Sequence, residues 1–436
     1  MKVASGVALE DARKRGAVLC IAVITFCAVV YQVTVLCLAW HWGYSGELSQ
    51  QVRGANLTPG NAEAWDRIGE GLAANFDAQP AGAISFFERA VKLNPRSARD
   101  WMDLAQAYEV NGNAPQANAA YEQAQRDYPI SAEVSWKYGN FLMRQGQTSE
   151  GLKEVHRALV TDPSLVPLAI SRIWSLDPDV HVILHDVLPQ GQQARLQALD
   201  FFAARHEEAA ALETWEEIAA FAKTKPIDIH DVFAFMQDLI SSDQAAEAER
   251  IWREALAASH WPDSEMTGGS QIWNGGFEEP IVNGGLDWRF EQVPGAYVSV
   301  DSNVHHSGEK SLRVDFTGGV NLDFWNVHQI VPVEPSTHYV FQYFMRTQSI
   351  STESGMRFEI LDLNDNEVNL MTPDLTGTNP WTPVRMDVAT GRNTHFLDIR
   401  LRRLPSRLFD NKLGGTVWVD DVSLSQKPAT GPESHP

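Results

Sequence analysis

One uninterrupted apolar run near the N-terminus constrains this chain more than any other feature. Residues 17–40 (AVLCIAVITFCAVVYQVTVLCLAW) contain no charged side chain, and only Thr25, Gln32 and Thr34 are clearly polar. A helix of this length would extend about 36 Å, enough to cross a hydrocarbon core of about 30 Å. A buried core helix or a cleaved signal peptide are the alternatives, but a signal core spans only about 7–15 residues and ends at small residues. We therefore predict a retained transmembrane helix over residues 17–42.

The residues that flank this run predict its orientation. Basic residues precede it and aromatic residues follow it: Arg13, Lys14 and Arg15 on one side, Trp40, Trp42 and Tyr44 on the other. Basic residues favour the cytoplasmic side of a membrane, and tryptophan and tyrosine favour the interface. We expect residues 1–16 to be a cytoplasmic tail at the inner membrane, with the bulk of the chain periplasmic or otherwise extracytoplasmic.

Charge and cysteine usage divide the chain at the same place. Residues 1–44 carry a net charge of +2, whereas the remainder carries −23, from 31 basic and 54 acidic side chains. A field of that sign repels phosphate backbones, so nucleic acid is not expected as a partner. Cys20, Cys27 and Cys37 all fall in the apolar run, so the rest of the chain can form neither a disulfide nor a cysteine metal site.

Residues 45–260 show a helical pattern that repeats about every 34 residues. The clearest copy has small, aromatic and proline residues at fixed offsets: Trp101, Leu104, Ala105, Tyr108, Ala117, Tyr121, Ala124 and Pro129. Similar copies begin at Trp65, with two extra residues around Gln79 and Pro80, and at Trp136. This pattern resembles the tetratricopeptide repeat (TPR). Residues 165–225 are also predicted to be helical, without a clear register, and a degenerate repeat is expected at about 230–258.

The resemblance implies stacked helix pairs with a groove along one side. Such a groove binds extended peptides or partner helices, so a protein partner is expected there. The aromatic residues of the pattern are expected to pack in the core. A linker rich in Gly, Ser and Asn (261–271) would join the array flexibly to an independent second domain, and residues 427–436 would form a disordered tail.

Residues 272–426 change to a two-residue alternation of apolar and polar side chains, as in SLRVDF and HFLDIRLRRL, which predicts a β-sandwich. Three segments, NGGFEEP, HSGEKSLRV and GGTVWVDDVSL, are similar to the opening, early and closing strands of galactose-binding-like jelly rolls, which include carbohydrate-binding modules. The predicted fold class is therefore multidomain: a single transmembrane helix, an all-α TPR solenoid and an all-β jelly-roll sandwich.

The jelly-roll resemblance implies one structural calcium ion where the first and last strands meet. Asn274, Glu278 and Asp421 match the positions that would supply its oxygen ligands. The alternative is that the two carboxylates are surface groups or turn formers. Residues 362–367 look like a second calcium loop but lack the necessary glycine, and we interpret them as a hairpin turn.

Carbohydrate binding requires an aromatic platform with polar groups beside it. The candidates on the expected strands are Trp325, His328, Gln342, Arg357, Arg400 and Arg402. The two arginines of the last pair could bind carboxylates of an acidic glycan. A solvated sheet face explains these residues equally well.

No motif for a nucleophile elbow, a phosphate loop, a dinucleotide turn or a zinc-protease helix occurs. We therefore expect a non-enzymatic envelope protein that binds a protein partner through its repeats and polysaccharide through its jelly roll, in assembly or export of surface or exopolysaccharide. The alternative is a scaffold that contacts only proteins.

Overall fold

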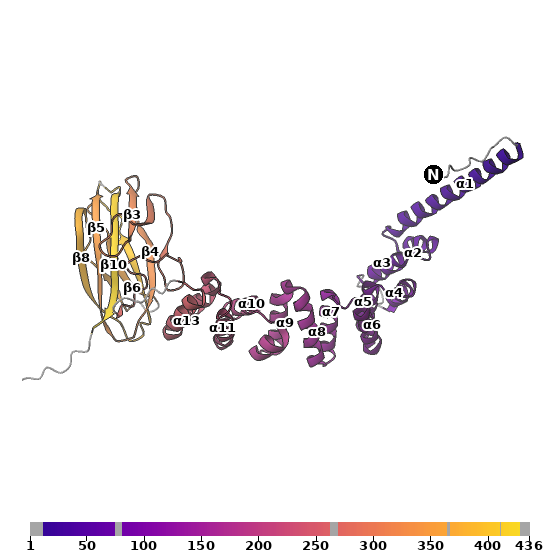
Figure 1. Ribbon diagram of the computed structural model, residues 1–436, viewed down its shortest axis with the longest axis horizontal. Coiled ribbons are helices and arrows are strands. Elements are labelled where there is room, and N and C mark those ends of the chain that lie inside the picture. Colours follow the sequence, from indigo (N-terminus) through magenta and orange to yellow (C-terminus); the bar gives the residue numbers. More distant parts are fainter. Residues whose placement is uncertain (1–11, 75–80, 262–268, 364–366, 410, 428–436) are drawn as a thin grey trace, which may run out of the picture. The chain divides into compact units, whose positions relative to one another are not determined.

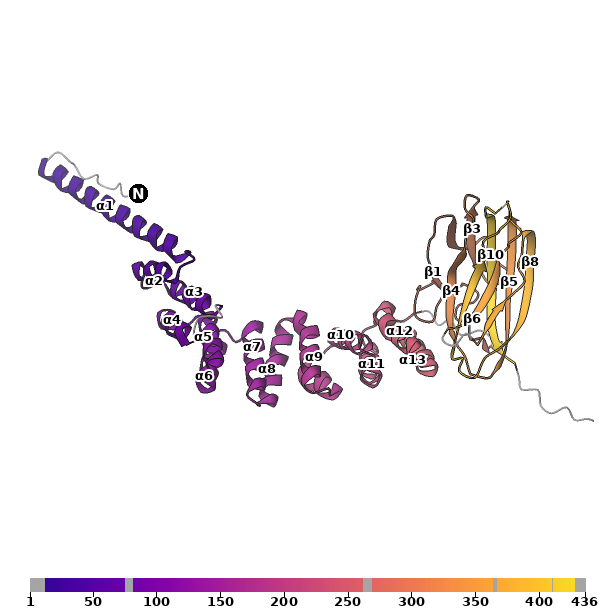
Figure 2. The same cartoon turned by 180° about the vertical axis from the view of Figure 1, so that it is seen from behind.

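The computed structural model describes residues 12–74, 81–261, 269–363, 367–409 and 411–427 (Figures 1 and 2). The predicted insertion at Gln79–Pro80, most of the predicted linker and the C-terminal tail lie outside these ranges, as do residues 364–366 of the calcium-like loop. Internal contacts divide the chain into two units. The first comprises Met1–Ala169 with His185–Pro189, and the second comprises Ile170–Leu184 with Gln190–Pro436.

The first unit begins with the apolar helix α1 (Ala12–Gly43), none of whose residues is buried. Its mean hydropathy reaches 2.4, and it is the one helix within the described ranges that is long and apolar enough to cross a membrane. Length and composition fit a membrane anchor or a signal sequence. Helix α2 (Leu48–Leu57) packs against its end. A side chain at Gly54 would come within 2.8 Å of the Ala39 carbonyl oxygen, so only glycine permits this approach.

Three helix pairs follow in the first unit, as the repeat pattern predicts. The serines Ser97 and Ser131 cap the first helices of the second and third pairs, because their hydroxyls accept the N–H groups of Asp100 and Val134. The predicted core alanines are fully buried. The pairs are α3 (Ala62–Ala73) with α4 (Ala81–Leu93), α5 (Ala98–Val110) with α6 (Ala114–Asp127), and α7 (Ala132–Arg144) with α8 (Thr148–Thr161).

The helical region continues beyond these pairs into the second unit, and the helices predicted there are confirmed. Trp215 and Trp252 are the largest fully buried side chains of the helices in the second unit. The elements are the 3₁₀ turn Pro163–Leu165, α9 (Val166–Leu176), the π-helical turn Val182–Val187, α10 (Gln192–Ala203), α11 (Glu208–Ala222), the 3₁₀ turn Ile229–Val232, α12 (Phe233–Ser241) and α13 (Ala245–Ala258).

The C-terminal region is the predicted jelly-roll sandwich of two antiparallel sheets, ordered β2-β3-β10-β5-β8 and β1-β4-β9-β6-β7. Alternate residues of each strand point inward, so Tyr343 and Val417 of one sheet share a core with Phe358 and Ile399 of the other. The strands are β1 (Arg289–Phe290), β2 (Ala296–Asp301), β3 (Ser311–Thr317), β4 (Phe324–Pro332), β5 (His338–Ile350), β6 (Arg357–Asp362), β7 (Asn369–Met371), β8 (Gly377–Ala389), β9 (Phe396–Arg403) and β10 (Gly414–Gln426).

Within the second unit, the last helix pair packs against the sandwich. The ring of Trp252 on α13 lies 6.5 Å from that of Trp273, edge to face, and is 1% exposed. Gly285, with a φ of +58°, lies so close that a Cβ there would be 2.1 Å from the Trp252 ring. The sequence led us to expect a flexible linker at residues 261–271 that leaves the two domains independent, and that expectation did not include this apolar contact.

Candidate functional site

The outward face of the sheet β1-β4-β9-β6-β7 gathers most of the candidate carbohydrate-binding residues. In β9, Leu397, Ile399 and Leu401 point into the core, so Arg400 and Arg402 lie on the opposite face. The strand register places Arg400 opposite His328 of β4 and opposite Glu359 of β6. Polar side chains from three strands therefore form one row across the sheet.

An exposed aromatic ring adjoins this row. Trp325 of β4 is 46% exposed. The guanidinium carbon of Arg400 lies 5.5 Å from the centre of its ring, within the range of a cation–π contact. Ring and cation together give the combination of apolar platform and charged hydrogen-bond donor that sugar recognition requires.

The charged groups of this face are largely paired with one another. Asp398 is 3% exposed and lies 2.6 Å from Arg400 Nη2 and 3.0 Å from His328 Nδ1. Burial by itself would raise the pKa of Asp398, but hydrogen bonds from His328 and Arg400 hold it below its usual value. Arg402 pairs with Asp323 and, at 3.4 Å, with Glu359.

Five of the six candidate sugar-binding residues lie in this sheet, and one does not. Arg357 of β6 stands opposite Arg402 and pairs with Asp374 at 2.9 Å. Gln342, in contrast, lies in β5 of the other sheet, where it pairs in register with Ser423 of β10. It lines a depression that also contains the candidate calcium ligands.

Asn274, Glu278 and Asp421 do line that common depression. The Asn274 side-chain amide donates a hydrogen bond to the Glu279 carbonyl oxygen at 3.0 Å, and its Oδ1 accepts the Glu279 N–H at 3.2 Å. Oε1 of Glu278 accepts the N–H groups of Glu309 and Lys310 at 2.8 and 3.1 Å. The carboxylate of Asp421 accepts the Ser307 hydroxyl at 2.6 Å and lies 2.6 Å from His306 Nδ1. The carboxylates thus face polar hydrogens of the 306–310 turn.

Asp420, which is not among the predicted calcium ligands, is the buried acid of this corner. It is 0% exposed and accepts the His306 and Ser307 N–H groups at 2.7 and 3.2 Å. Burial raises its pKa to about 6. At a register shift between Asp420 and Ser423, with a φ of +51° at Asp421, both adjacent acids contact the same turn at His306 and Ser307. The doubled aspartate in an otherwise alternating strand was the available signal.

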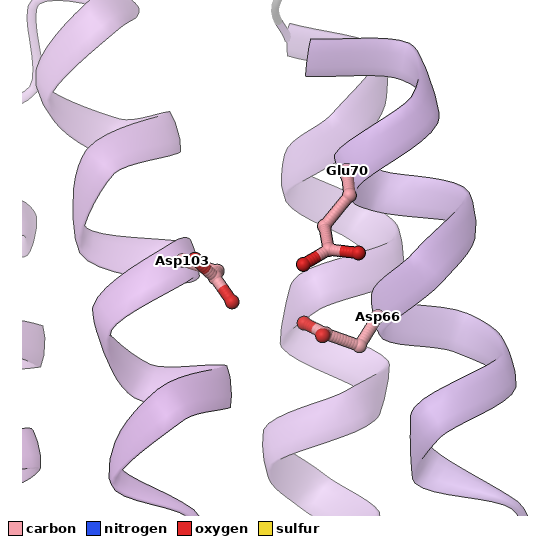
Figure 3. A group of neighbouring side chains, drawn as sticks. All are labelled: Asp66, Glu70 and Asp103. Atoms are coloured by element: carbon pink, nitrogen blue, oxygen red, sulfur yellow. The ribbon is translucent and has the colours of Figure 1, made fainter. Parts of the chain in front are cut away.

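A second acidic group, also missed, lies between the first helices of two successive repeats. Asp66 and Glu70 of α3 point toward Asp103 of α5 (Figure 3). Asp66 is 3% exposed, and burial, with repulsion from Asp103, Asp100 and Glu70, raises its pKa to about 7. Burial likewise raises the pKa of Asp103 to about 6. The spacing of Asp66 and Glu70, four residues apart on one helix face, was the sequence signal.

The sequence matches no known protein-family model. No curated protein sequence is significantly similar to it. Solved structures similar to parts of the chain include TPR proteins and carbohydrate-binding modules. A structure described as "CBM4 structure and function" is 18% identical, with 36% of this chain and 99% of that chain covered and a TM-score of 0.28. A thermophilic TPR protein from Thermus thermophilus is 20% identical, covering 30% of this chain and 71% of its own, with a TM-score of 0.27. The TPR protein YrrB is 15% identical over 49% of this chain and 93% of its own, with a TM-score of 0.25.

Proposed function

We propose that this chain is a non-enzymatic, membrane-anchored envelope protein whose jelly roll binds polysaccharide. The observation that carries the proposal is the exposed Trp325 ring with the Arg400 guanidinium beside it, on a sheet face lined by further polar side chains. A sugar ring would stack on the indole, and its hydroxyls or carboxylates would accept hydrogen bonds from the arginine. In an acidic glycan, the uronate carboxylate would compete with Asp398 for Arg400.

The repeat array would hold a protein partner in the same assembly. The first helices of the three pairs, α3, α5 and α7, lie next to one another in the first unit. Exposed charged side chains such as Arg99 on α5 supply polar contacts for an extended peptide. With α1 as an inner-membrane anchor and the N-terminus in the cytoplasm, both binding domains would lie in the periplasm, where surface or exopolysaccharide is assembled or exported.

One observation favours the alternative of a protein-only scaffold. The arginines of the sheet face already have carboxylate partners within the chain: Asp398 for Arg400, and Asp323 and Glu359 for Arg402. Such ion pairs can have a purely structural role in the sandwich, and this sheet face would then have no carbohydrate ligand.

Binding of the full-length protein in detergent to an array of neutral and acidic glycans tests the proposal. Trp325→Ala should abolish binding because the stacking platform is removed. Trp381→Ala is the matched control, since Trp381 lies in β8 of the other sheet, near His306. Complete silence of the wild-type protein, or equal losses in both variants, would favour the scaffold.

A structural calcium ion at the Glu278 and Asp421 corner remains part of this proposal. A cation there would replace the turn N–H groups and His306 as the partner of the two carboxylates. Millimolar Ca²⁺ should then raise the Tm of the sandwich by mass action. The double variant Glu278→Ala, Asp421→Ala should lose the part of the rise that belongs to this corner, and an unchanged rise would remove calcium from it.

Topology has its own test. A reporter that is active only outside the cytoplasm, fused to the C-terminus, should be active, and the fusion should stay in the membrane after a carbonate wash. An inactive reporter, or a soluble product, would contradict the anchor.

A further inference from the structure

The crevice between α3 and α5 brings three carboxylates together. Asp66 and Glu70 project from one face of α3, and Asp103 projects toward them from α5 (Figure 3). One oxygen from each side chain lies within 4.8 Å of the others. It is the one such group of histidine, cysteine or acidic side chains in the described part of the chain.

One of these acids, Asp66, is buried with an oxygen that lacks a hydrogen-bond partner. Asp66 is 3% exposed, and its Oδ1 has no hydrogen-bond partner among the described residues. Oδ2 of Asp103 is also without a hydrogen bond, and the nearest cationic atom to it, Arg99 Nε, is 3.8 Å away. A buried carboxylate that lacks donors is strongly destabilising unless a cation or a proton compensates it.

The neighbouring cations compensate these acids only in part: Lys137 and Arg99 attract Asp103, yet burial keeps its pKa raised. Arg99 is 67% exposed and binds Glu70 at 2.6 Å, at the outer rim of the crevice. Lys137 of α7 pairs with Glu133 at 2.9 Å. Asp100 adds another partly unpaired acid, because its Oδ2 has no hydrogen bond. The crevice therefore holds an excess of negative charge.

We propose that Asp66, Glu70 and Asp103 bind a calcium ion between the first two repeats. The donors are carboxylate oxygens only, which suits a hard cation. The three oxygens lie within 4.8 Å of one another, close enough for one ion to contact all of them. Ca²⁺ takes about 6–8 oxygen ligands in flexible geometry, whereas Mg²⁺ is usually held by only one or two carboxylates, so three carboxylates favour the larger ion. Water would complete the shell on the side of Glu70, which is 41% exposed.

The bound ion would link α3 to α5 and so join two successive repeats. Because each repeat stacks only on its neighbours, a link here would stiffen the part of the groove that lies next to the membrane helix in sequence. This goes beyond the proposed binding of protein and polysaccharide, and it does not depend on either.

Equilibrium dialysis of the full-length protein in detergent with ⁴⁵Ca²⁺, after removal of bound metal with a chelator, tests the site. Asp66→Asn with Asp103→Asn should lose one bound equivalent relative to wild type. The control, Glu63→Gln with Glu150→Gln, removes the same charge from exposed positions of α3 and α8 and should lose none. Glu278→Gln with Asp421→Asn is measured in parallel, so that an equivalent at the sandwich is counted separately.

Unchanged stoichiometry in the Asp66/Asp103 variant would overturn the proposal. Displacement of the ⁴⁵Ca²⁺ bound at Asp66 and Asp103 by equimolar Mg²⁺ would contradict the choice of calcium as the ion. If the double variant does not fold, Glu70→Gln at the rim decides: it should weaken calcium binding at this site about tenfold, and an unchanged affinity would refute the site.

Discussion

Two aspartates of equal burial behave in opposite ways in the two halves of this protein. Asp66 in the repeats and Asp398 in the sandwich are each 3% exposed. Burial and neighbouring acids raise the pKa of Asp66 to about 7, whereas His328 and Arg400 hold that of Asp398 below its usual value despite burial. Burial alone therefore does not decide the charge of an acid. The partners supplied by neighbouring elements decide it.

The difference indicates what each site lacks. On the sandwich face, Asp398 is paired with Arg400 and His328 of the same chain, and these pairs stabilise the fold. A ligand could bind the arginine only if its own charged groups replaced the carboxylate. Between α3 and α5, the nearby cations compensate the buried acids only in part, which is the condition under which an external cation or proton binds.

Removal of Asp398 should have the largest effect. Asp398→Ala leaves Arg400 and His328 without their shared carboxylate, so the free energy of unfolding should fall by about 2–4 kcal/mol in urea titrations. Asp387→Ala is the control, because that carboxylate is 71% exposed and its pair with Lys427 is at the surface, where little change is expected. Equal effects of the two changes would mean that burial of the Asp398 cluster has no energetic importance.

Overpacking the core of one repeat tests whether the repeats and the sandwich unfold independently. Ala117 is fully buried, so Ala117→Trp should cost about 1–3 kcal/mol and lower the first thermal transition. Ala119→Trp on the exposed face of the same helix should not. Calorimetry should show the transition of the sandwich unchanged in both variants. A single transition that moves as a whole would show that the repeats and the sandwich unfold together.

Neutralising Asp66 should have a smaller effect of opposite sign. In the presence of a chelator, Asp66→Asn removes a repelled, unpartnered charge while it keeps the shape, so the repeats should gain about 1–2 kcal/mol. Glu63→Gln, at a carboxylate that is 75% exposed and paired with Arg67, should not stabilise them. Destabilisation by Asp66→Asn in metal-free buffer would mean that the carboxylate has a partner of its own.

The smallest expected effect is on the pH dependence of stability, to which Asp66 and Asp398 should contribute with opposite signs. A raised pKa means that folded Asp66 binds a proton more tightly than the unfolded chain, so stability is highest below about 4 and is lost as pH rises toward 7. A lowered pKa at Asp398 contributes stability above the unfolded value of 3.8, which is lost as pH falls through the folded value. Each slope is at most about 1.4 kcal/mol per pH unit. Thermal melting in metal-free buffers of different pH measures both slopes, and Asp66→Asn should flatten the pH dependence of the repeats. If stability of the repeats and of the sandwich changes with pH in the same direction, the assignment is wrong.

The sequence was informative wherever a period or a local signal determines the structure. The 34-residue spacing around Trp101 predicts the helix pairs because small residues must recur where two helices touch. Alternation in HFLDIRLRRL separates Leu397, Ile399 and Leu401 from Arg400, and the structure confirms both faces. The same alternation cannot say which strands are neighbours, so Gln342 was grouped with residues of the other sheet.

What the sequence alone determined is the order of the parts: an apolar helix, helix pairs and a two-sheet sandwich, each encoded by local periodicity and by the side chains at its ends. Tertiary structure decided the partners. It packs Trp252 of α13 against the sandwich, surrounds the buried Arg403 with the Leu322 and Asn411 carbonyls, and leaves Oδ1 of Asp66 without a donor. Such contacts join residues far apart in the chain, and the energy of a buried charge depends on those neighbours rather than on its place in a local pattern.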